Sequence, residues 1–318
     1  MRIPNVAPGA KVLAFGGYQP STVVTNDDLA KTMETNDEWI QSRVGIKERR
    51  VAGPEESLAD MATQAGGKAL AASGLAASDI DLVIVATCTP ESMIPNVAAT
   101  VAHRLGIEAP GAFDVNAACA GFCYALATAS AAIRGGSAKH VLVVGAEKLS
   151  QWTDWTDRAT AVIFADGAGA AVVGPADEPG IGPVVWGSAG DKFDAIIVKD
   201  RNSFLHQEGQ TVFRWATTAL APVALEACER AGVDPSELAA FVPHQANLRI
   251  IEAIARKLGA HNAVIARDIV LAGNTSAASV PLALSRMIER GEVQSGGLAL
   301  LLGFGAGLTY AGQVIEIP

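Results

Sequence analysis

The chain resembles itself, and this repeat limits its architecture more than any other feature. Two pairs of segments carry the likeness: Lys68–Gly74 with Asp79–Val85, and Glu226–Gly232 with Glu237–Pro243. Gly232 follows Gly74 by 158 residues, since 232 minus 74 gives 158. Farther along, His103–Gly106 is similar to Arg256–Gly259, at an offset of 259 minus 106, or 153. A long-period repeat means that one structural unit has been duplicated. We therefore predict two related halves.

Short apolar runs typical of strands alternate with alanine-rich stretches of helical length. The predicted strands are Leu82–Ala86, Ala112–Val115, His140–Val144, Phe241–Pro243 and Leu298–Leu302. This alternation predicts an α/β fold with a buried, largely parallel sheet. The segment Pro175–Pro183 is rich in turn-forming residues and divides the chain into domains of residues 1–175 and 176–318.

Composition excludes several classes of protein. Half of the 318 residues are hydrophobic, which is enough for a large core, and 24 basic residues against 33 acidic ones argue against a nucleic-acid binder. The apolar runs are far shorter than the roughly 20 residues that span a bilayer. Met1–Pro20 does not resemble a secretory signal, and four cysteines are few for this length, so we expect reduced thiols and a cytoplasmic location.

Cys119 is the strongest candidate nucleophile. It follows the predicted strand Ala112–Val115 and opens an apolar helix from about Ala120 to Ile133. A helix N-terminus lowers the pKa of a thiol and supplies N–H donors for an oxyanion. A buried cysteine can instead be an inert packing residue. We expect packing for Cys123 and Cys228, a place in the pocket wall for Cys88, and no metal site because further ligands are missing.

His244 and Asn274 are the candidate partners of Cys119. His244 ends a predicted strand of the second half, and Asn274 lies where the repeat places the counterpart of the Cys119 segment. Strand ends on one edge of an α/β sheet converge, so the three residues can share a pocket. The alternatives are a structural histidine and an asparagine that only caps a helix or forms a turn. The other four histidines are interpreted as surface or cap residues: His103, His140, His206 and His261.

Two glycine-rich segments lack the spacing of a nucleotide-binding loop. We interpret Gly303–Gly307 as a tight turn near the pocket that leads into a strand, Thr309–Ile317. Asp166–Gly169 is interpreted as a packing turn.

Three motifs together resemble β-ketoacyl-acyl-carrier-protein synthase III, the initiating condensing enzyme of fatty-acid synthesis. They are Ala117–Phe122, Pro243–Arg249 and Gly273–Ser279, and the likeness covers nearly the whole chain. The resemblance implies the thiolase fold, a duplicated α-β-α-β-α core in five layers, and a homodimer. It implies that Cys119 takes an acyl group from acyl-coenzyme A and that the acyl group is condensed with malonyl-acyl carrier protein. Acyl-coenzyme A is then a substrate, and no cofactor is expected.

The same resemblance implies roles for further residues. His244 and Asn274 would donate hydrogen bonds to the malonyl thioester oxygen during decarboxylation, and the backbone N–H groups of Cys119 and Ala306 would form an oxyanion hole. Position 306 is often glycine in the family, so Ala306 requires an ordinary backbone angle. The residues expected to bind coenzyme A are Thr35, Trp39, Arg43, Arg158 and Asn247. Those expected to line the primer pocket are Ile94, Ile163, Phe164 and Phe304.

An acidic protein needs a local basic face to receive an acidic carrier domain. Leu248–Leu258 is predicted to be a helix with Arg249, Arg256 and Lys257 on one side, and Arg214 resembles a further position of the family's docking patch. The alternative is an ordinary solvated helix face.

Two other functions stay open. A related priming ketosynthase or acyltransferase of a polyketide or secondary-metabolite pathway shares much of this constellation. A non-catalytic subunit is disfavoured because such subunits usually lack the cysteine that is present here as Cys119.

Overall fold

The computed structural model describes residues 7–318, so Met1–Val6, and with them part of the expectation for Met1–Pro20, lie outside the described residues. Two five-stranded sheets form its framework. In spatial order the first sheet consists of β1 (Gly9–Tyr18), β7 (Asp166–Ala176), β6 (Val141–Lys148), β4 (Leu82–Ala86) and β5 (Gly111–Val115). The second consists of β12 (Val264–Ile265), β11 (Leu238–Pro243), β13 (Leu298–Gly305), β14 (Thr309–Glu316) and β8 (Val185–Gly187).

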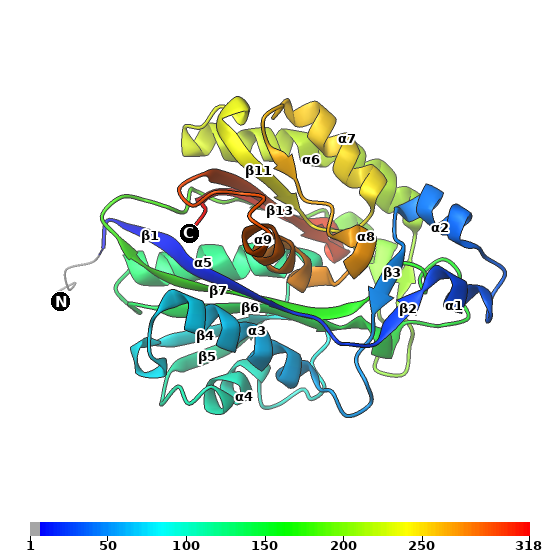
Figure 1. Cartoon of the computed structure of the whole chain (residues 1–318), viewed down its shortest axis with the longest axis horizontal. Helices are drawn as coiled ribbons and strands as arrows, with labels where there is room; N and C mark the ends of the chain where they lie inside the picture. The colour runs from blue at the N-terminus through cyan, green and yellow to red at the C-terminus, as the bar shows by residue number, and fades with distance from the viewer. Residues whose placement is uncertain (1–6) are drawn as a thin grey trace.

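The helices form three layers around the two sheets (Figure 1). The central layer contains α5 (Gly121–Arg134) and α9 (Ser279–Glu289). The outer layers contain α3 (Leu58–Ser73) and α4 (Val97–Arg104) on the first sheet, and α6 (Gly209–Ala231) and α7 (Leu248–Leu258) on the second. This α-β-α-β-α order confirms the predicted five-layered, thiolase-like fold.

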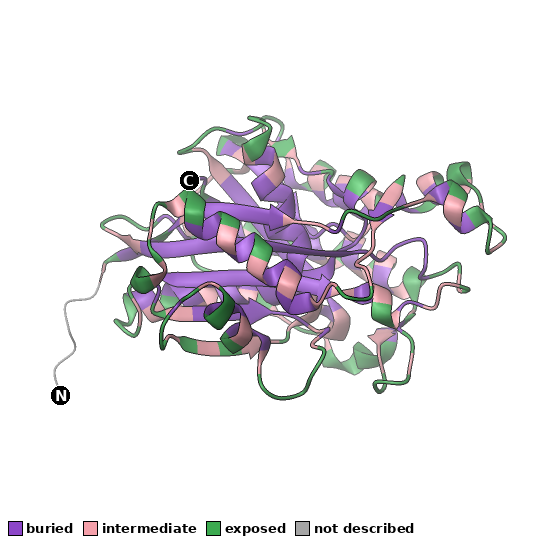
Figure 2. Cartoon of the chain, turned by 60° about the horizontal axis from the view of Figure 1, so that its bottom comes forward, coloured by how far each residue is buried: buried purple, intermediate pink, exposed green. Residues whose placement is uncertain are grey.

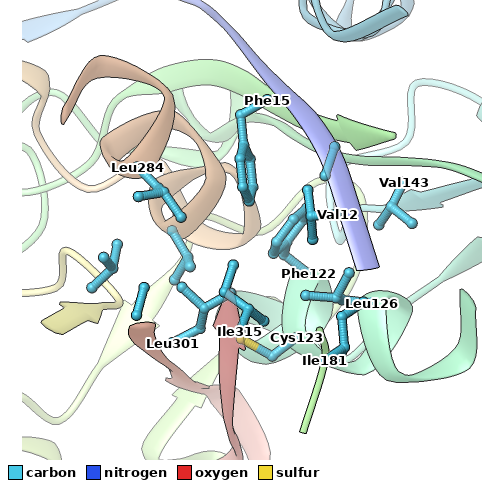
Figure 3. Close-up of a cluster of buried hydrophobic side chains, with 14 of the residues drawn as sticks. Val12, Phe15, Phe122, Cys123, Leu126, Val143, Ile181, Leu284, Leu301 and Ile315 are labelled. Carbon is cyan, nitrogen blue, oxygen red and sulfur yellow. The ribbon is translucent and has the colours of Figure 1, made fainter. Parts of the chain in front are cut away.

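The central layer is apolar because α5 and α9 are covered on both sides by sheets. Phe122 and Leu126 of α5 and Leu284 of α9 pack with Leu301 of the second sheet and Val143 of the first in one buried cluster (Figure 3). Figure 2 shows the strands buried, while the outer helices expose one face to solvent. Burial on both faces explains why the strands are runs of apolar residues rather than alternating ones.

Strand register confirms that the chain is doubled. In the first sheet Leu82 of β4 pairs with Val141 of β6, in parallel, and in the second Ala240 of β11 pairs with Ala299 of β13. Both members of the second pair lie 158 residues after those of the first. The first sheet takes its strands from residues 9–176 and the second from residues 185–316. We propose the two halves as domains on this basis.

Smaller elements extend from the core on the side that carries the pocket. They are β2 (Val23–Thr25), α1 (Asn26–Ala30), α2 (Asp37–Val44), β3 (Glu48–Arg50), β9 (Ile196–Ile197), β10 (His206–Gln207) and α8 (Ile269–Ala272).

Two expectations for single segments were wrong. Asp166–Gly169 is not a turn but the start of β7, where a Cβ on Gly169 would lie 2.5 Å from the backbone nitrogen of Leu282. Glycine there lets α9 approach the strand closely. His140 is not a surface residue: it is 9% exposed, and its Nδ1 lies 3.0 Å from the carbonyl oxygen of Asp79.

Candidate active site

Cys119 lies in a 3-10 turn, Ala118–Ala120, between β5 and α5. Ala118 has a φ of 46°, a left-handed conformation that residues other than glycine rarely adopt. Its N–H donates to Oδ1 of Asn116 at 3.2 Å, which holds the turn. The turn carries the thiol to the wall of the pocket, in front of the first turn of α5.

The Cys119 thiol is protonated at rest, contrary to the pKa lowering expected at a helix N-terminus. Burial raises its pKa to about 12, and the charge of Glu147 acts in the same direction. Removal of the thiol from water therefore outweighs the local donors. Attack by this sulfur on any electrophile therefore includes loss of the thiol proton.

Gly305 allows the chain to pass directly over Cys119. A Cβ at this position would lie 2.8 Å from Cβ and 2.9 Å from Sγ of Cys119, so no larger residue fits. Ala306 follows in a 3-10 turn, Ala306–Leu308, and has no positive φ, as its side chain requires. Residues 305 and 306 and Cys119 all line the same pocket.

His244 follows β11 and is 1% exposed. Its Nδ1 lies 2.7 Å from Oγ of Ser279, and this hydroxyl accepts the backbone N–H of Gln245 at 3.2 Å. The Ser279 hydroxyl can therefore donate its hydrogen to Nδ1, which leaves the hydrogen of the neutral ring on Nε2. Burial lowers the pKa of His244 to about 3, so the ring is neutral and presents an N–H donor at physiological pH. Phe304 packs edge-on against it, with ring centroids 5.1 Å apart.

Asn274 is held at both its backbone and its side chain. Its N–H donates to the carbonyl of Ile163 at 3.0 Å and its carbonyl accepts from Ala165 at 2.9 Å. Its Oδ1 accepts the N–H of Ser276 at 2.8 Å. Because the amide oxygen is engaged, the NH2 group is the part left to serve as a donor.

One pocket of about 1150 Å³ contains Cys119, His244 and Asn274, so the structure brings the three candidate residues together. Ile163, Phe164 and Phe304 also line it, as does Cys88. Ile94 does not: its side chain is 86% exposed and lies outside the pocket of its own chain, because the loop before α4 faces away from it.

The residues expected at coenzyme A lie at or near the mouth of the pocket. Trp39, Arg43 and Asn247 line it. The Arg158 guanidinium lies 4.6 Å from the centroid of the Trp39 ring, although Arg158 does not itself line the pocket. Thr35 is also outside the lining, and its buried Oγ1 has no hydrogen-bond partner among residues 7–318.

The four basic candidates divide into two pairs. Arg214 and Arg249 line the pocket, and the Arg249 guanidinium lies 4.9 Å from the centroid of the Phe213 ring. Arg256 and Lys257 lie farther along α7, outside the lining, and Lys257 donates to the carbonyl of Thr217 at 2.6 Å.

Several site residues were not found from the sequence. Ser276 and Ser279 lie within a motif that was singled out, but only contacts with Asn274 and His244 reveal their parts. The wall formed by Ile196–Val198 and Leu205 gave no signal, since the stretch between β8 and α6 has only the two-residue strands β9 and β10 and little periodicity to detect. Within residues 7–318 no helix is long and apolar enough to cross a membrane. The same residues contain no cluster of three metal-ligating side chains.

Comparison with known proteins gives the family. The family model for 3-oxoacyl-(acyl-carrier-protein) synthase III matches residues 113–190, and the model for the C-terminal part of the same enzyme matches residues 228–317. The chain is 56% identical to β-ketoacyl-(acyl-carrier-protein) synthase III 4 of Streptomyces coelicolor over 313 residues, which is 98% of this chain and 99% of that one.

Solved structures agree with the sequence relatives. The priming β-ketosynthase of a polyketide biosynthetic pathway superposes with a TM-score of 0.97 at 44% identity, covering 100% of this chain and 98% of that one. The 3-oxoacyl-(acyl-carrier-protein) synthase III of Aquifex aeolicus gives 0.92 at 41% identity, covering 97% and 100%. The chain therefore belongs to the 3-oxoacyl-(acyl-carrier-protein) synthase III family of condensing acyltransferases, which have the thiolase fold.

Proposed function

We propose that this enzyme condenses an acyl-coenzyme A primer with malonyl-acyl carrier protein and so initiates fatty-acid biosynthesis. The observation that carries the proposal is the meeting of one thiol and two fixed donors, Cys119, His244 and Asn274, in a single pocket. The relatives named β-ketoacyl-(acyl-carrier-protein) synthase III support it over nearly the whole chain.

In the first half-reaction, Sγ of Cys119 attacks the thioester carbon of acyl-coenzyme A. A carbon-sulfur bond forms to Cys119, the bond to coenzyme A breaks, and the thiol proton leaves with the coenzyme A thiol. The N–H groups of Cys119 and Ala306 stabilise the oxyanion formed during this exchange. Gly305 supports this assignment because it lets Ala306 lie close to the nucleophile.

In the second half-reaction, malonyl-carrier protein loses carbon dioxide, and negative charge develops on its thioester oxygen. Neutral His244 and the Asn274 NH2 group donate to that oxygen and stabilise the enolate. The enolate carbon attacks the acyl-cysteine, and the 3-ketoacyl-carrier protein leaves while the Cys119 thiolate regains a proton from solvent. The contacts to Ser279 and Ser276, which direct both donors, support this role.

A priming ketosynthase of a polyketide pathway is the second candidate, favoured by the TM-score of 0.97 to such an enzyme. A product assay separates the two. Purified enzyme is given acetyl- or isobutyryl-coenzyme A with malonyl-carrier protein from the fatty-acid or the polyketide system, and 3-ketoacyl products are identified by mass spectrometry. Fatty-acid initiation predicts higher kcat/KM with the fatty-acid carrier, whereas higher kcat/KM with the polyketide carrier contradicts it.

We propose that Trp39 and Arg158 hold the adenine of coenzyme A, since a guanidinium and an indole can stack on a flat base. The Arg158 guanidinium lies 4.6 Å from the centroid of the Trp39 ring, which supports a shared site, and a base bound between them requires the two side chains to separate. Thr35, Arg43 and Asn247 are proposed neighbours of the nucleotide. The carrier domain is proposed to dock on Arg214, Arg249, Arg256 and Lys257.

We also propose a homodimer joined at the edge of the first sheet. β5 is an edge strand, and unpaired strand edges favour association. Phe113 of β5 is 36% exposed, and Met93 and Ile94 nearby are 81% and 86% exposed. Light scattering should give a mass of two chains for the wild type and a mass of one chain for Phe113→Glu. The proposed substrates and the free thiol of Cys119 both suit a cytoplasmic enzyme.

A further inference from the structure

Glu147 is a buried carboxylate that the proposed reaction leaves without a role. It lies near the end of β6 and is 0% exposed. Five groups donate to it from two segments, 87–89 and 276: Thr87 Oγ1 at 3.1 Å, Thr89 Oγ1 at 2.5 Å, Cys88 N–H at 3.2 Å, Cys88 Sγ at 3.3 Å and Ser276 Oγ at 3.0 Å. A buried carboxylate that stays charged is expected to have several hydrogen-bond donors around it.

The directions of these hydrogen bonds are fixed by their surroundings. Thr89 Oγ1 accepts the N–H of Lys148 at 2.9 Å, and Thr87 Oγ1 accepts the N–H of Thr89 at 3.1 Å. Each hydroxyl therefore has its own hydrogen available for Glu147. Burial raises the pKa of Glu147 above its ordinary value, and the hydrogen bonds from Thr89, Cys88 and Ser276 act against that shift. Every contact of the carboxyl group is with a donor, which favours the ionised form.

The contact with Ser276 connects this carboxylate to the pocket. Ser276 donates through its hydroxyl to Glu147 and through its N–H to Oδ1 of Asn274, at 3.0 and 2.8 Å. It has a φ of 49°, a conformation that persists only when the surroundings impose it. Two residues before Glu147, a Cβ on Gly145 would lie 2.4 Å from the carbonyl oxygen of Ala277, so the segment 274–279 lies directly on β6.

We infer that Glu147 is a positioning residue for decarboxylation: through Ser276 it fixes the Asn274 carboxamide so that its NH2 group faces the thioester oxygen. The inference rests on the proposed function. The positioning acts through the hydrogen bonds of Ser276, whereas the charge of Glu147 disfavours the thiolate of Cys119.

Glu147→Gln and Ser276→Ala should both impair condensation. Without the carboxylate contact, Ser276 and the Asn274 amide lose their fixed orientation, and small displacements of a catalytic group cost up to about a hundredfold in rate. We expect roughly a 10- to 100-fold loss of carbon dioxide release from malonyl-carrier protein by the pre-acylated enzyme in each variant. Acylation of Cys119 by acyl-coenzyme A, followed by intact-protein mass spectrometry, should fall much less in Glu147→Gln.

Glu147→Gln should also change the reactivity of Cys119. Burial raises the pKa of the thiol, and the charge of Glu147 raises it further. At a fixed pH near 8, Glu147→Gln should therefore alkylate faster with iodoacetamide than the wild type, whereas Ser276→Ala, which keeps the carboxylate, should not. A residue that merely stabilises the fold would not slow decarboxylation and at the same time speed alkylation.

Asp166→Asn is the matched control, because Asp166 is also 0% exposed and its carboxylate accepts three donors, from Ala52 and Ser150. None of these belongs to the segment 274–279. We expect both Asp166→Asn and Glu147→Gln to have a lowered melting temperature. In Asp166→Asn, however, the ratio of the decarboxylation rate to the acylation rate should be unchanged. Failure of Glu147→Gln to fold leaves Ser276→Ala, which retains the carboxylate and four of its five donor contacts, to decide the matter.

Equal loss of both half-reactions in Glu147→Gln, or wild-type decarboxylation in the folded Ser276→Ala variant, would overturn the inference. A wild-type enzyme that neither becomes acylated nor releases carbon dioxide would instead contradict the proposed function. The alkylation rates, which need no substrate, still report whether the charge of Glu147 acts on Cys119 as described.

Discussion

The segments Asn116–Gly121 and Asn274–Ser279 occupy equivalent places in the two halves and have the same backbone design. Asn116 and Asn274 each accept the N–H two residues later, at 3.2 and 2.8 Å. Ala118 and Ser276 are both left-handed, with φ of 46° and 49°. In both cases a 3-10 turn follows and leads directly into a central helix. Every one of these pairs is 158 residues apart, since 274 minus 116 and 276 minus 118 both give 158.

Each segment lies against a strand of the opposite half. A Cβ on Gly303 of β13 would lie only 2.9 Å from Cα of Ala120, so glycine at this position leaves room for Ala120. Gly145 of β6 leaves room for Ala277 in the same way. The difference appears two residues farther along each strand. Position 305 is glycine and accommodates Cys119, whereas the equivalent position, 147, is a glutamate that binds Ser276. One duplicated framework thus presents the candidate nucleophile from one half and the candidate hydrogen-bond donors from the other.

The strongest test of this division is Cys119→Ala. We expect complete loss of the acyl adduct when the variant is incubated with a short acyl-coenzyme A, measured by intact-protein mass spectrometry, because the acyl group has no other attachment in the proposed reaction. Cys228→Ala, which changes a buried cysteine of α6, should keep the adduct. An adduct that survives in Cys119→Ala would assign the nucleophile to another residue.

Removing the donors of the second half should separate the two half-reactions. His244→Ala and Asn274→Ala are expected to reduce condensation on the order of a hundredfold or more, since each removes one donor to the developing oxyanion. Acylation of Cys119 should change far less. If both half-reactions decline equally in either variant, the donors do not belong to decarboxylation alone.

Gly305→Ala should selectively impair acylation of Cys119, the half-reaction assigned to the first half of the chain. The added Cβ would lie within 3 Å of Cys119, so the thiol or the Ala306 N–H must move, and acylation is expected to decrease by about a hundredfold. Gly190→Ala is the control, because a Cβ there meets no atom within 4 Å. Normal acylation in Gly305→Ala would show that the contact is not restrictive.

Arg249→Glu tests whether the second half also receives the carrier. We expect about a tenfold loss of kcat/KM for malonyl-carrier protein at low salt and a weaker salt dependence, because attraction between opposite charges is screened over roughly 10 Å. Acylation by coenzyme A substrates should be affected less. Arg134→Glu, at the exposed end of α5, is the matched charge reversal. Similar behaviour of the two variants would leave Arg249 without a docking role.

The last expected effect is on stability rather than on rate and comes from the neutral His244. Its pKa is about 3 in the folded protein, below the value of about 6.5 for an exposed histidine. The unfolded chain therefore binds a proton below pH 6.5 that the folded protein does not bind, so stability decreases as the pH falls toward 3. Between pH 7 and pH 5 the wild type should lose about 2 kcal/mol more unfolding free energy than His244→Gln. Equal losses in urea titrations would contradict a neutral, buried ring.

Local sequence patterns predicted the elements of the framework well. The runs Leu82–Ala86 and Leu248–Leu258 became β4 and α7 with those bounds, because burial on two faces and helical periodicity both leave marks in adjacent residues. The repeat predicted the doubled core, and three motifs predicted the pocket that contains Cys119, His244 and Asn274.

Tertiary structure alone decided the solvation of the site residues and the contacts between them. The raised pKa of Cys119 comes from enclosure by segments distant in sequence, so the local helix N-terminus gave the wrong direction. The exposure of Ile94 and the pocket wall from Ile196–Val198 depend on how loops fold over the core. The contact between Glu147 and Ser276 joins residues 129 positions apart and has no local pattern. Sequence specifies which residues lie along each strand and helix, but solvation and distance between strands are properties of the packed molecule.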